Sequence, residues 1–597
     1  MMKFPSILLS LLAVAPSAVV VVNAYDVGCL YPPNMPDPFE ARYLLHEYSG
    51  SYLMNQAIET PVVIHVAALS SLCQHNCVAY HDDKMLNAVT EERPIVSIPQ
   101  EYHNSWSRML CIAQCFELLG NEAGHSGTYD LFWDKWGLDN LQERKDIIGL
   151  AWLTSQDGDT KALESVLEND DYHPYTVAQI VATEILLDVI EDGWNALGEW
   201  TYDKTTGQPI KCTANCERYK DTTGYFPRNH ATGKPEVNGT QYIVEGVDKY
   251  WQPLDDNDNN GFFSAQHHVT PHIGFMGKAK LHDSVDDFPT APDPEYNYRE
   301  EALEVVERLK ETASDPIKKQ KIAFFDNKLL VINLVEGYVK RKFNENYSFE
   351  DEILYIEGMS AGEYEATLMA WRAKVQHDLV RPTTVIQRWG NDQLETFDGN
   401  KEADGPGIIA ARDFQAFQRV MPHSEYPSGS SCICTAYSEF TDAFTMEYYD
   451  DTITDITFGA LGNSTGFGCN PEQDPPLLHQ AGCQSDFTIP NMKALLNECS
   501  QSRLWAGFHF TAAVVEGEKM CAGVGLKAME REKKLRNGSS FGTPFYQGDA
   551  RPTCTNPPPE MVEVGLTDTI LSSAAATNKV ISAVVAANLA LFFAAAM

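Results

Sequence analysis

Lys374-Val-Gln-His-Asp-Leu-Val-Arg381-Pro382 is one of three short stretches, far apart in the chain, that together supply the groups of an anion site. The other two are Tyr426-Pro-Ser-Gly-Ser430 and Ser502-Arg-Leu-Trp-Ala-Gly-Phe-His509. They contribute three cations, a hydroxyl, a glycine amide and a histidine. Three positive side chains would repel a metal cation, so the set predicts a small tetrahedral or bipyramidal oxyanion as the ligand.

The first stretch is predicted to end a helix. Ser360-x-x-Glu363 fits a capping box and indicates where that helix begins. Pro382 stops it, because the residue before a proline avoids the α region. Lys374 and Arg381 recur at helical spacing, so we expect them to share one face and reach one ligand. Taken alone, the spacing is more typical of a solvated basic edge.

The second stretch is predicted to be a turn that opens a helix. Pro427 fixes the entry of the chain, and Gly429 lets the backbone approach a ligand closely. Ser428, Ser430 and Ser431 are natural N-cap residues. Because the first amides of a helix point at whatever lies before it, this turn is a suitable anion seat.

The third stretch carries Arg503, whose guanidinium can bind two oxygens of an oxyanion at once. His509 follows six residues later, and on one ideal helix the two side chains would point far apart. We therefore expect a bend near Gly507, or an approach to the ligand from two sides. A lone buried histidine is usually a hydrogen-bonded core residue, and His509 is a site candidate only because of its companions.

Together the three stretches resemble the vanadium-dependent haloperoxidases and the wider acid phosphatase superfamily that shares their pocket. The family pattern is Lys-x6-Arg-Pro, then Pro-Ser-Gly-His, then Ser-Arg-x5-His, and only one position, the histidine of the second block, differs here. The long gap between the second and third blocks is more like the haloperoxidases. The resemblance covers roughly residues 240–525, with weaker support at Tyr250-Trp-Gln-Pro-Leu254 and Thr270-Pro-His-Ile-Gly274.

The resemblance implies a role for each matched residue. The cofactor-binding set would be Lys374, Arg381, Ser428, Gly429, Arg503 and His509. The three cations would neutralise vanadate oxygens, the serine hydroxyl and glycine amide would donate to equatorial oxygens, and His509 would bind vanadium through a ring nitrogen. Vanadate would act as a Lewis acid that activates hydrogen peroxide, with Lys374 polarising the peroxide, and a halide would be oxidised.

Two residues depart from the family. The acid–base histidine beside the apical oxygen is Ser430 here, and a hydroxyl cannot exchange protons near neutral pH as imidazole does. His423, where some bromoperoxidases carry a histidine, and His377 are candidate replacements. The second departure is Ala513, where many relatives have an aspartate spaced to orient the ligating histidine. Another carboxylate or carbonyl must then orient His509.

The first 24 residues are predicted to be a secretory signal peptide, with a basic start, an apolar core and a Val-Asn-Ala cleavage site. The 14 cysteines lie outside it and predict disulfides in an oxidising compartment. Cys73-x3-Cys77 and Cys111-x3-Cys115 are placed to join a helical hairpin, with a zinc site as the alternative. Sequons at four asparagines allow glycans: Asn238, Asn346, Asn463 and Asn537.

The C-terminal segment of residues 579–597 is apolar and uncharged, and a Pro/Ser/Ala-rich linker of residues 551–578 precedes it. Small residues followed by an apolar tail indicate a GPI-attachment signal, and a membrane-spanning anchor is the alternative. Between the ends we expect an N-terminal helical region over residues 25–240 and a site-bearing region over residues 241–550.

The composition predicts a mainly α, acidic protein. With 45 basic and 83 acidic residues the formal net charge is -38, which excludes nucleic acid as a partner. Helical periodicity dominates, for example in Ile185–Ile190, Leu303–Leu309 and Leu329–Val335. We therefore expect helical bundles of the vanadium haloperoxidase type, with long loops that carry cysteines.

Asp256-Asn-Asp-Asn-Asn-Gly261 matches the first half of a calcium loop, but its twelfth position is His267 rather than glutamate. A solvated acidic turn is the main interpretation, and a weak calcium site is the alternative.

The sequence thus predicts a secreted vanadate-dependent haloperoxidase that uses hydrogen peroxide, a halide and a small organic acceptor, with bromide or iodide preferred to chloride. Two alternatives remain open. One is an acid phosphatase-like phosphomonoesterase, and the other is an oxyanion-binding surface protein that has lost catalysis. The oligomeric state is not predicted.

Overall fold

The structure is a computed structural model that describes residues 59–123, 172–225, 249–458 and 487–539, with short gaps, together with parts of 34–45 and residues 551–552. These residues fall within one compact unit, Tyr31–Pro552. The predicted signal peptide, the apolar tail and nearly all of the linker lie outside the described residues, as does the predicted boundary near residue 240.

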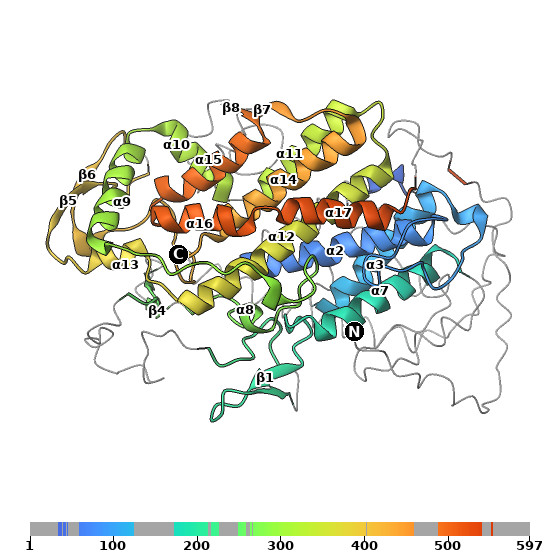
Figure 1. Cartoon of the computed structure of the whole chain (residues 1–597), viewed down its shortest axis with the longest axis horizontal. Helices are drawn as coiled ribbons and strands as arrows, with labels where there is room; N and C mark the ends of the chain where they lie inside the picture. The colour runs from blue at the N-terminus through green and yellow to red at the C-terminus, as the bar shows by residue number, and fades with distance from the viewer. Residues whose placement is uncertain are drawn as a thin grey trace, which may run out of the picture. The chain divides into compact units, whose positions relative to one another are not determined.

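Helices make up most of the described chain, as the sequence predicts (Figure 1). The α-helices are α2 (Thr60–Tyr80), α3 (Ser105–Ala123), α7 (Pro174–Glu191), α8 (Ile273–Met276), α9 (Tyr298–Ala313), α10 (Pro316–Asp326), α11 (Lys328–Phe343), α12 (Phe349–His377), α13 (Pro382–Gln387), α14 (Gly429–Tyr449), α15 (Met492–Trp505), α16 (Thr511–Cys521) and α17 (Val524–Arg536). The three helices predicted from periodicity correspond to α7, α9 and α11.

The described strands form four separate two-stranded antiparallel pairs. They are β1 (Trp200–Tyr202) with β2 (Pro209–Lys211), β3 (Asp255–Asn257) with β4 (Phe263–Ala265), β5 (Gln393–Thr396) with β6 (Gly407–Ala410), and β7 (Thr454–Phe458) with β8 (Phe487–Asn491). Short 3-10 turns are η2 (Gln100–Tyr102), η4 (Val285–Asp287) and η5 (Ala411–Asp413).

The long helix α12 is the central element, and α2, α14, α17 and α8 pack along it. Ser348 caps its first turn in a capping box with Asp351, so the predicted start at Ser360 is wrong. Ser360 and Glu363 lie inside the helix and are buried. Because α12 is buried on nearly every side, its sequence has no polar face from which the true start could be predicted.

The end of α12 also differs from the prediction. The helix ends at His377, because the next residue, Asp378, adopts a left-handed conformation with φ of 52°. Pro382 does not end this helix but opens the short helix α13, with Arg381 as its N-cap residue. Lys374 and Arg381 therefore lie on either side of a chain reversal rather than on one helix face.

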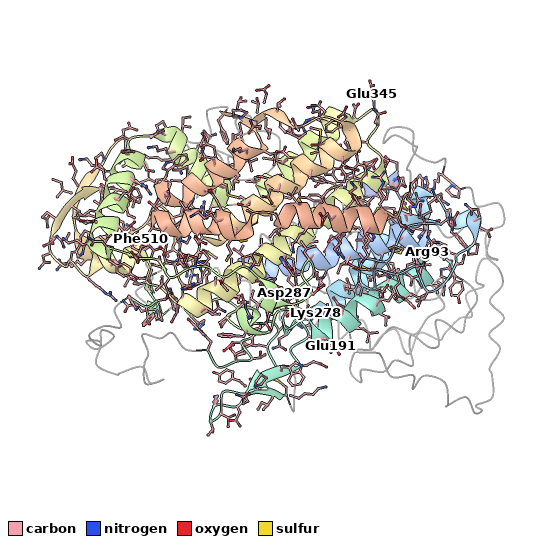
Figure 2. The ribbon with its side chains drawn as sticks, in the orientation of Figure 1. Arg93, Glu191, Lys278, Asp287, Glu345 and Phe510 are labelled. Atoms are coloured by element: carbon pink, nitrogen blue, oxygen red, sulfur yellow. A yellow bond between two sulfur atoms is a disulfide. The ribbon has the colours of Figure 1, made fainter. Side chains whose placement is uncertain are left out.

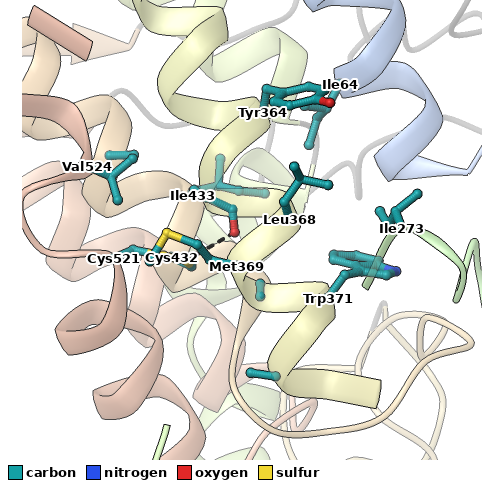
Figure 3. Packing of buried hydrophobic residues seen from close by; sticks show 14 of the residues in the cluster. Ile64, Ile273, Tyr364, Leu368, Met369, Trp371, Cys432, Ile433, Cys521 and Val524 are labelled. Carbon is teal, nitrogen blue, oxygen red and sulfur yellow. Dashed lines mark hydrogen bonds between the residues drawn. A yellow bond between two sulfur atoms is a disulfide. The ribbon is translucent and has the colours of Figure 1, made fainter. Parts of the chain in front are cut away.

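The core next to this reversal packs α12 against α2, α8, α14 and α17 (Figure 3). Trp371 and Leu368 of α12 lie beside Ile273 of α8, and Ile433 and Cys432 of α14 fill the other side. Acidic side chains such as Glu191, Asp287 and Glu345 lie exposed on the outside (Figure 2).

The disulfides confirm the predicted helical hairpin. Two bonds join α2 to α3, which rules out zinc at these cysteines. The described disulfides are Cys73–Cys115, Cys77–Cys111, Cys212–Cys216, Cys432–Cys521 and Cys434–Cys499. Four of the five join helices and one closes a loop. Among the described helices, α2 alone is long and apolar enough to cross a membrane, but 78% of its apolar window is buried within this fold.

Candidate active site

Lys374 lies in the last turn of α12 and is fully buried. Its ammonium donates to three backbone carbonyls, those of Ser424 at 2.9 Å, Glu425 at 3.1 Å and Pro427 at 2.6 Å. These bonds fix the loop before α14 against the end of α12. Lys374 thus contributes its charge to the site from a held position, and a direct bond to a ligand requires that it release one carbonyl.

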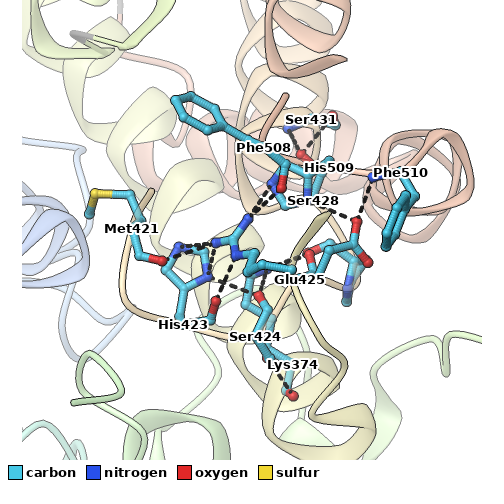
Figure 4. Close-up of polar contacts among 12 residues, drawn as sticks. Lys374, Met421, His423, Ser424, Glu425, Ser428, Ser431, Phe508, His509 and Phe510 are labelled. Carbon is cyan, nitrogen blue, oxygen red and sulfur yellow. Dashed lines mark hydrogen bonds and ion pairs between the residues drawn. The ribbon is translucent and has the colours of Figure 1, made fainter. Parts of the chain in front are cut away.

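Arg381 reaches the same loop from the N-cap of α13. Figure 4 shows the polar contacts around His423, Ser424 and Glu425 of this loop. Its Nε donates to the carbonyl of His423 at 2.8 Å, and its Nη1 donates to the carbonyl of Phe508 at 3.0 Å. Nη1 also lies 3.3 Å from Nε2 of His509. The loop that precedes the second stretch and the third stretch are therefore joined through one guanidinium.

The helix α14 begins as predicted. Ser428 is its N-cap residue and accepts a hydrogen bond from the backbone N–H of Ser431 at 3.4 Å, and Gly429 is the first helical residue. A Cβ at Gly429 would lie 3.4 Å from the ring of Trp371 and 3.7 Å from Cε of Lys374. The glycine thus leaves room between the helix end and Lys374.

Ser430 is half-buried in the first turn of α14. The next residue, Ser431, is buried and donates its hydroxyl to Ser428 Oγ at 3.0 Å. This bond leaves the Ser428 hydroxyl proton available for a ligand.

Arg503 lies in the last turn of α15 and is also buried. Its Nη1 pairs with Asp326 at the end of α10 at 2.8 Å, and its Nε donates to Ser502 Oγ at 3.0 Å. Its guanidinium lies over the ring of Phe508 at 5.2 Å.

The predicted bend near Gly507 is present. Gly507 has φ of +74°, and a Cβ there would come within 2.6 Å of Leu309. Its conformation therefore favours glycine, and any larger residue would also have to displace the Leu309 side chain. The bend ends α15 at Trp505, starts α16 at Thr511 and turns His509 back toward Arg381.

His509 is buried and contacts opposite charges through its two nitrogens. Nδ1 lies 3.2 Å from Oε1 of Glu425, and Nε2 lies 3.3 Å from Nη1 of Arg381. A carboxylate accepts and a guanidinium donates, so the contacts together place the proton on Nδ1. Nε2 then carries no proton, which is the state that a metal-binding imidazole requires.

Glu425 is the site residue that the sequence did not reveal. It is fully buried, three residues before Ser428, and 84 residues from His509. Its Oε1 also accepts the backbone N–H of Phe510 at 2.9 Å, and its Oε2 accepts the hydroxyl of Tyr296 at 3.0 Å. No local spacing links Glu425 to His509, so only the fold brings them together.

The side chains lie close enough to change one another's pKa. Burial and then the charge of Arg381 hold the pKa of Lys374 well below its usual value. Burial, followed by Arg381, Lys374 and Arg503, holds the pKa of His509 well below 6.5, so its ring is neutral at neutral pH. Burial raises the pKa of Glu425 to about 7, although Arg381 and Lys374 oppose the shift. The three cations thus act on a common region.

The two candidate replacement histidines lie in different places. His423 is buried beside Arg381, whose Nη2 lies 2.9 Å from its Nδ1, and its ring lies 5.0 Å from that of Trp371. His377 instead contacts Asp293 at 3.0 Å through Nδ1. The structure therefore brings His423 to the site and directs His377 to another loop.

Ala513 occupies the position at which the resemblance implies an aspartate. Its side chain is fully buried on α16 in a cluster with Leu379 and Tyr426, and its carbonyl accepts the backbone N–H of Ser428 at 2.9 Å. Position 513 therefore supports the second stretch through its backbone, and Glu425 contacts the histidine from another direction.

The calcium alternative receives no support from the residues with described positions. Asp256 and Asn257 lie in β3, and most of the acidic turn lies outside those residues. Within the described residues, no group of three or more His, Cys, Asp or Glu side chains is arranged to hold a metal ion.

Comparison with known proteins places this geometry in a family context. Residues 355–538 match the family model described as the VCPO second helical-bundle domain. The fold is similar to two solved structures of a bacterial vanadium-dependent chloroperoxidase at 20% identity, over 80% of this chain. The apo form is covered over 95% of its length with a TM-score of 0.59, and the holo form over 93% with a TM-score of 0.61. No curated protein sequence matches the chain significantly. The predicted resemblance and helical fold of the vanadium haloperoxidases are confirmed.

Proposed function

We propose that this chain is a secreted vanadate-dependent haloperoxidase that oxidises bromide or iodide, in preference to chloride, with hydrogen peroxide. A small organic molecule would accept the halogen. The observation that carries the proposal is the convergence of three buried cations on a neutral histidine whose Nε2 faces Arg381. The phosphomonoesterase alternative would use the same nitrogen of His509 as a nucleophile, so the activity assays below distinguish the two functions.

The donor set fits vanadate. Arg381, Arg503 and Lys374 supply positive charge, while Ser428 and the first amides of α14 supply hydrogen-bond donors. His509 supplies the nitrogen that would bind the metal. When bound, vanadate supplies Lewis-acid activation of the peroxide oxygen.

The protein residues would position the oxyanion and neutralise its charge. Arg381 holds the loop before α14 and the loop before α16 in one register, so Ser428 and His509 face a common ligand. His423, next to Arg381, is the candidate that would exchange protons in place of the acid–base histidine, whose position Ser430 occupies here. Its pKa lies well below 6.5 because of burial and the neighbouring cations, so it would begin as a neutral acceptor.

The proposal is tested by binding and by activity. Folded protein should retain vanadate after desalting, phosphate should compete, and vanadate with peroxide should support bromide oxidation. Failure to bind vanadate at neutral pH would overturn the proposal. Phosphate-ester hydrolysis without halide oxidation would favour the phosphomonoesterase, and tight oxyanion binding with neither activity would favour a binding protein.

We also propose that the protein passes through the secretory route and reaches the cell surface. The basis is the signal-like sequence of residues 1–24 and the apolar segment of residues 579–597. Mature protein should begin after Ala24, and phospholipase should release it if the tail is a GPI signal. Recovery of the C-terminal peptide from mature protein would instead support a membrane-spanning anchor.

A further inference from the structure

Glu425 contacts all three anion-binding stretches. Its backbone N–H donates to Leu379 of the first stretch at 2.9 Å, and its carbonyl accepts from Lys374. Its carboxylate accepts from His509 and from the backbone of Phe510, next to the third stretch. It lies immediately before Tyr426, where the second stretch begins.

The carboxylate is held in one orientation by several donors. Oε1 accepts from Phe510 N–H and faces Nδ1 of His509, and Oε2 accepts from the Tyr296 hydroxyl. Because Phe510 is the N-cap residue of α16, the carboxylate is tied to the start of that helix. A fixed acceptor at Nδ1 selects one tautomer of the imidazole.

We propose that Glu425 is the positioning residue of His509, holding the imidazole as the Nδ1–H tautomer so that Nε2 faces the oxyanion site. The inference rests on the proposed function for its ligand, but the tautomer itself is a property of the unliganded protein. Glu425 thus supplies, from the loop before α14, the acceptor that Ala513 cannot supply from α16.

The chain offers a matched control in Glu365. This glutamate is also fully buried, lies 2.7 Å from Nδ1 of His282, and accepts the backbone N–H groups of Lys280 at 2.8 Å and Leu281 at 3.1 Å. It makes the same kinds of bonds outside the anion site. Glu365→Ala therefore reproduces the general cost of removing a buried carboxylate.

The first experiment measures vanadate and phosphate affinities separately. Glu425→Ala should weaken vanadate binding by about tenfold or more, the usual effect of losing a partner of a metal ligand. Phosphate binding needs no nitrogen ligand, and Glu425→Ala removes a carboxylate that would repel the anion. Phosphate affinity should therefore hold or rise. Equal weakening of both ligands, or a selective loss in Glu365→Ala, would overturn the proposal.

A second variant covers the case in which Glu425→Ala does not fold. Glu425→Gln keeps an oxygen toward His509 and Phe510, and its amide can donate to the Tyr296 oxygen. Vanadate affinity should then stay within about threefold of the parent, since losing the hydrogen-bond partner of a metal ligand usually costs more. A loss as large as that predicted for alanine would show that an acceptor at this position is not what His509 requires.

The third measurement needs no vanadate. In protein with 15N-labelled histidine, the signal missing from His509→Ala identifies His509, and its shifts report which nitrogen carries the proton. We expect the Nδ1–H tautomer in the parent and in Glu425→Gln. In Glu425→Ala the population of the Nε2–H tautomer should rise, since only Arg381 still opposes it. An unchanged tautomer would overturn the positioning role. If the tautomer changes but no variant binds vanadate, the proposed function fails and the role of Glu425 stands.

Discussion

Nη1 of Arg381 lies 3.3 Å from Nε2 of His509, so a cation neighbours the one nitrogen of this ring that carries no proton. A buried arginine beside a neutral histidine favours an anion next to them, because the anion would offset the positive charge. The same contact joins the start of α13 to the loop between α15 and α16.

Replacing His509 distinguishes the contribution of the nitrogen ligand from that of the three cations. His509→Ala should abolish halide oxidation and reduce vanadate affinity toward that for phosphate, because the nitrogen ligand is gone and the cations remain. Phosphate affinity should change little. Isothermal titration with both anions and a bromide oxidation assay measure this, and equal activity in the variant would show that His509 is a core residue only.

Ser430→His should restore a titrating group beside the ligand. General acid–base catalysis typically contributes about 10²–10⁴-fold in rate, so we expect faster bromide oxidation and a new pH dependence near the ordinary imidazole pKa of about 6.5. Ser430→Ala is the matched control and should leave the pH profile unchanged. If the histidine variant folds, binds vanadate and gains nothing, proton transfer at this position does not limit the rate.

The disulfide Cys434–Cys499 joins the first turns of α14, which begins with Gly429, to α15, which carries Arg503. Replacing both cysteines by serine should weaken oxyanion binding at a temperature where the protein stays folded, because the two helices that carry these proposed site residues lose their cross-link. The expected loss of stability is about 2–5 kcal/mol.

The control for that variant is the pair Cys73 and Cys115, which joins α2 to α3 away from the anion-binding stretches. Its removal should cost less stability, because Cys77–Cys111 still joins the same two helices, and should leave phosphate affinity unchanged. If both double variants weaken phosphate binding equally, the cross-link at α15 has no special role in the site.

The buried carboxyl of Glu532 on α17 should make the free energy of unfolding depend on pH. Glu532 is fully buried, and burial raises its pKa to about 8, although its bond with Tyr448 opposes the shift. Between its ordinary pKa near 4.5 and about 8 the unfolded state loses the proton first. This group therefore destabilises the fold as pH rises through that range, by up to about 4–5 kcal/mol.

Glu532→Gln should accordingly raise the melting temperature at pH 9 relative to the parent, with little gain at pH 4. The exposed Glu530, on the same helix, provides the control, since Glu530→Gln should show no such pH-dependent difference. A gain for Glu532→Gln that is equal at both pH values would contradict the buried-carboxyl explanation.

The sequence predicted what depends on local chemistry. The N-cap at Ser428, the bend at Gly507 and the paired cysteines of α2 and α3 follow from turn residues and helical spacing. Those signals are strong because each requires a particular residue within a few positions.

The limits of α12 and the role of Glu425 could not be predicted from local patterns. Ser348 and Ser360 both fit a capping pattern, and only tertiary burial of the whole helix decides between them. The reversal at Asp378 depends on a left-handed residue that is not a glycine. Glu425 acts on His509 across 84 positions, a distance at which spacing carries no information.

The pairing of β7 with β8 has a consequence for engineering the chain. Phe458 pairs with Phe487, so the ends of the two strands lie side by side between α14 and α15. The entropy needed to close a loop grows only slowly with its length. A change in the length of the chain between Phe458 and Phe487 should therefore cost little stability, because the paired strands already hold these two residues together.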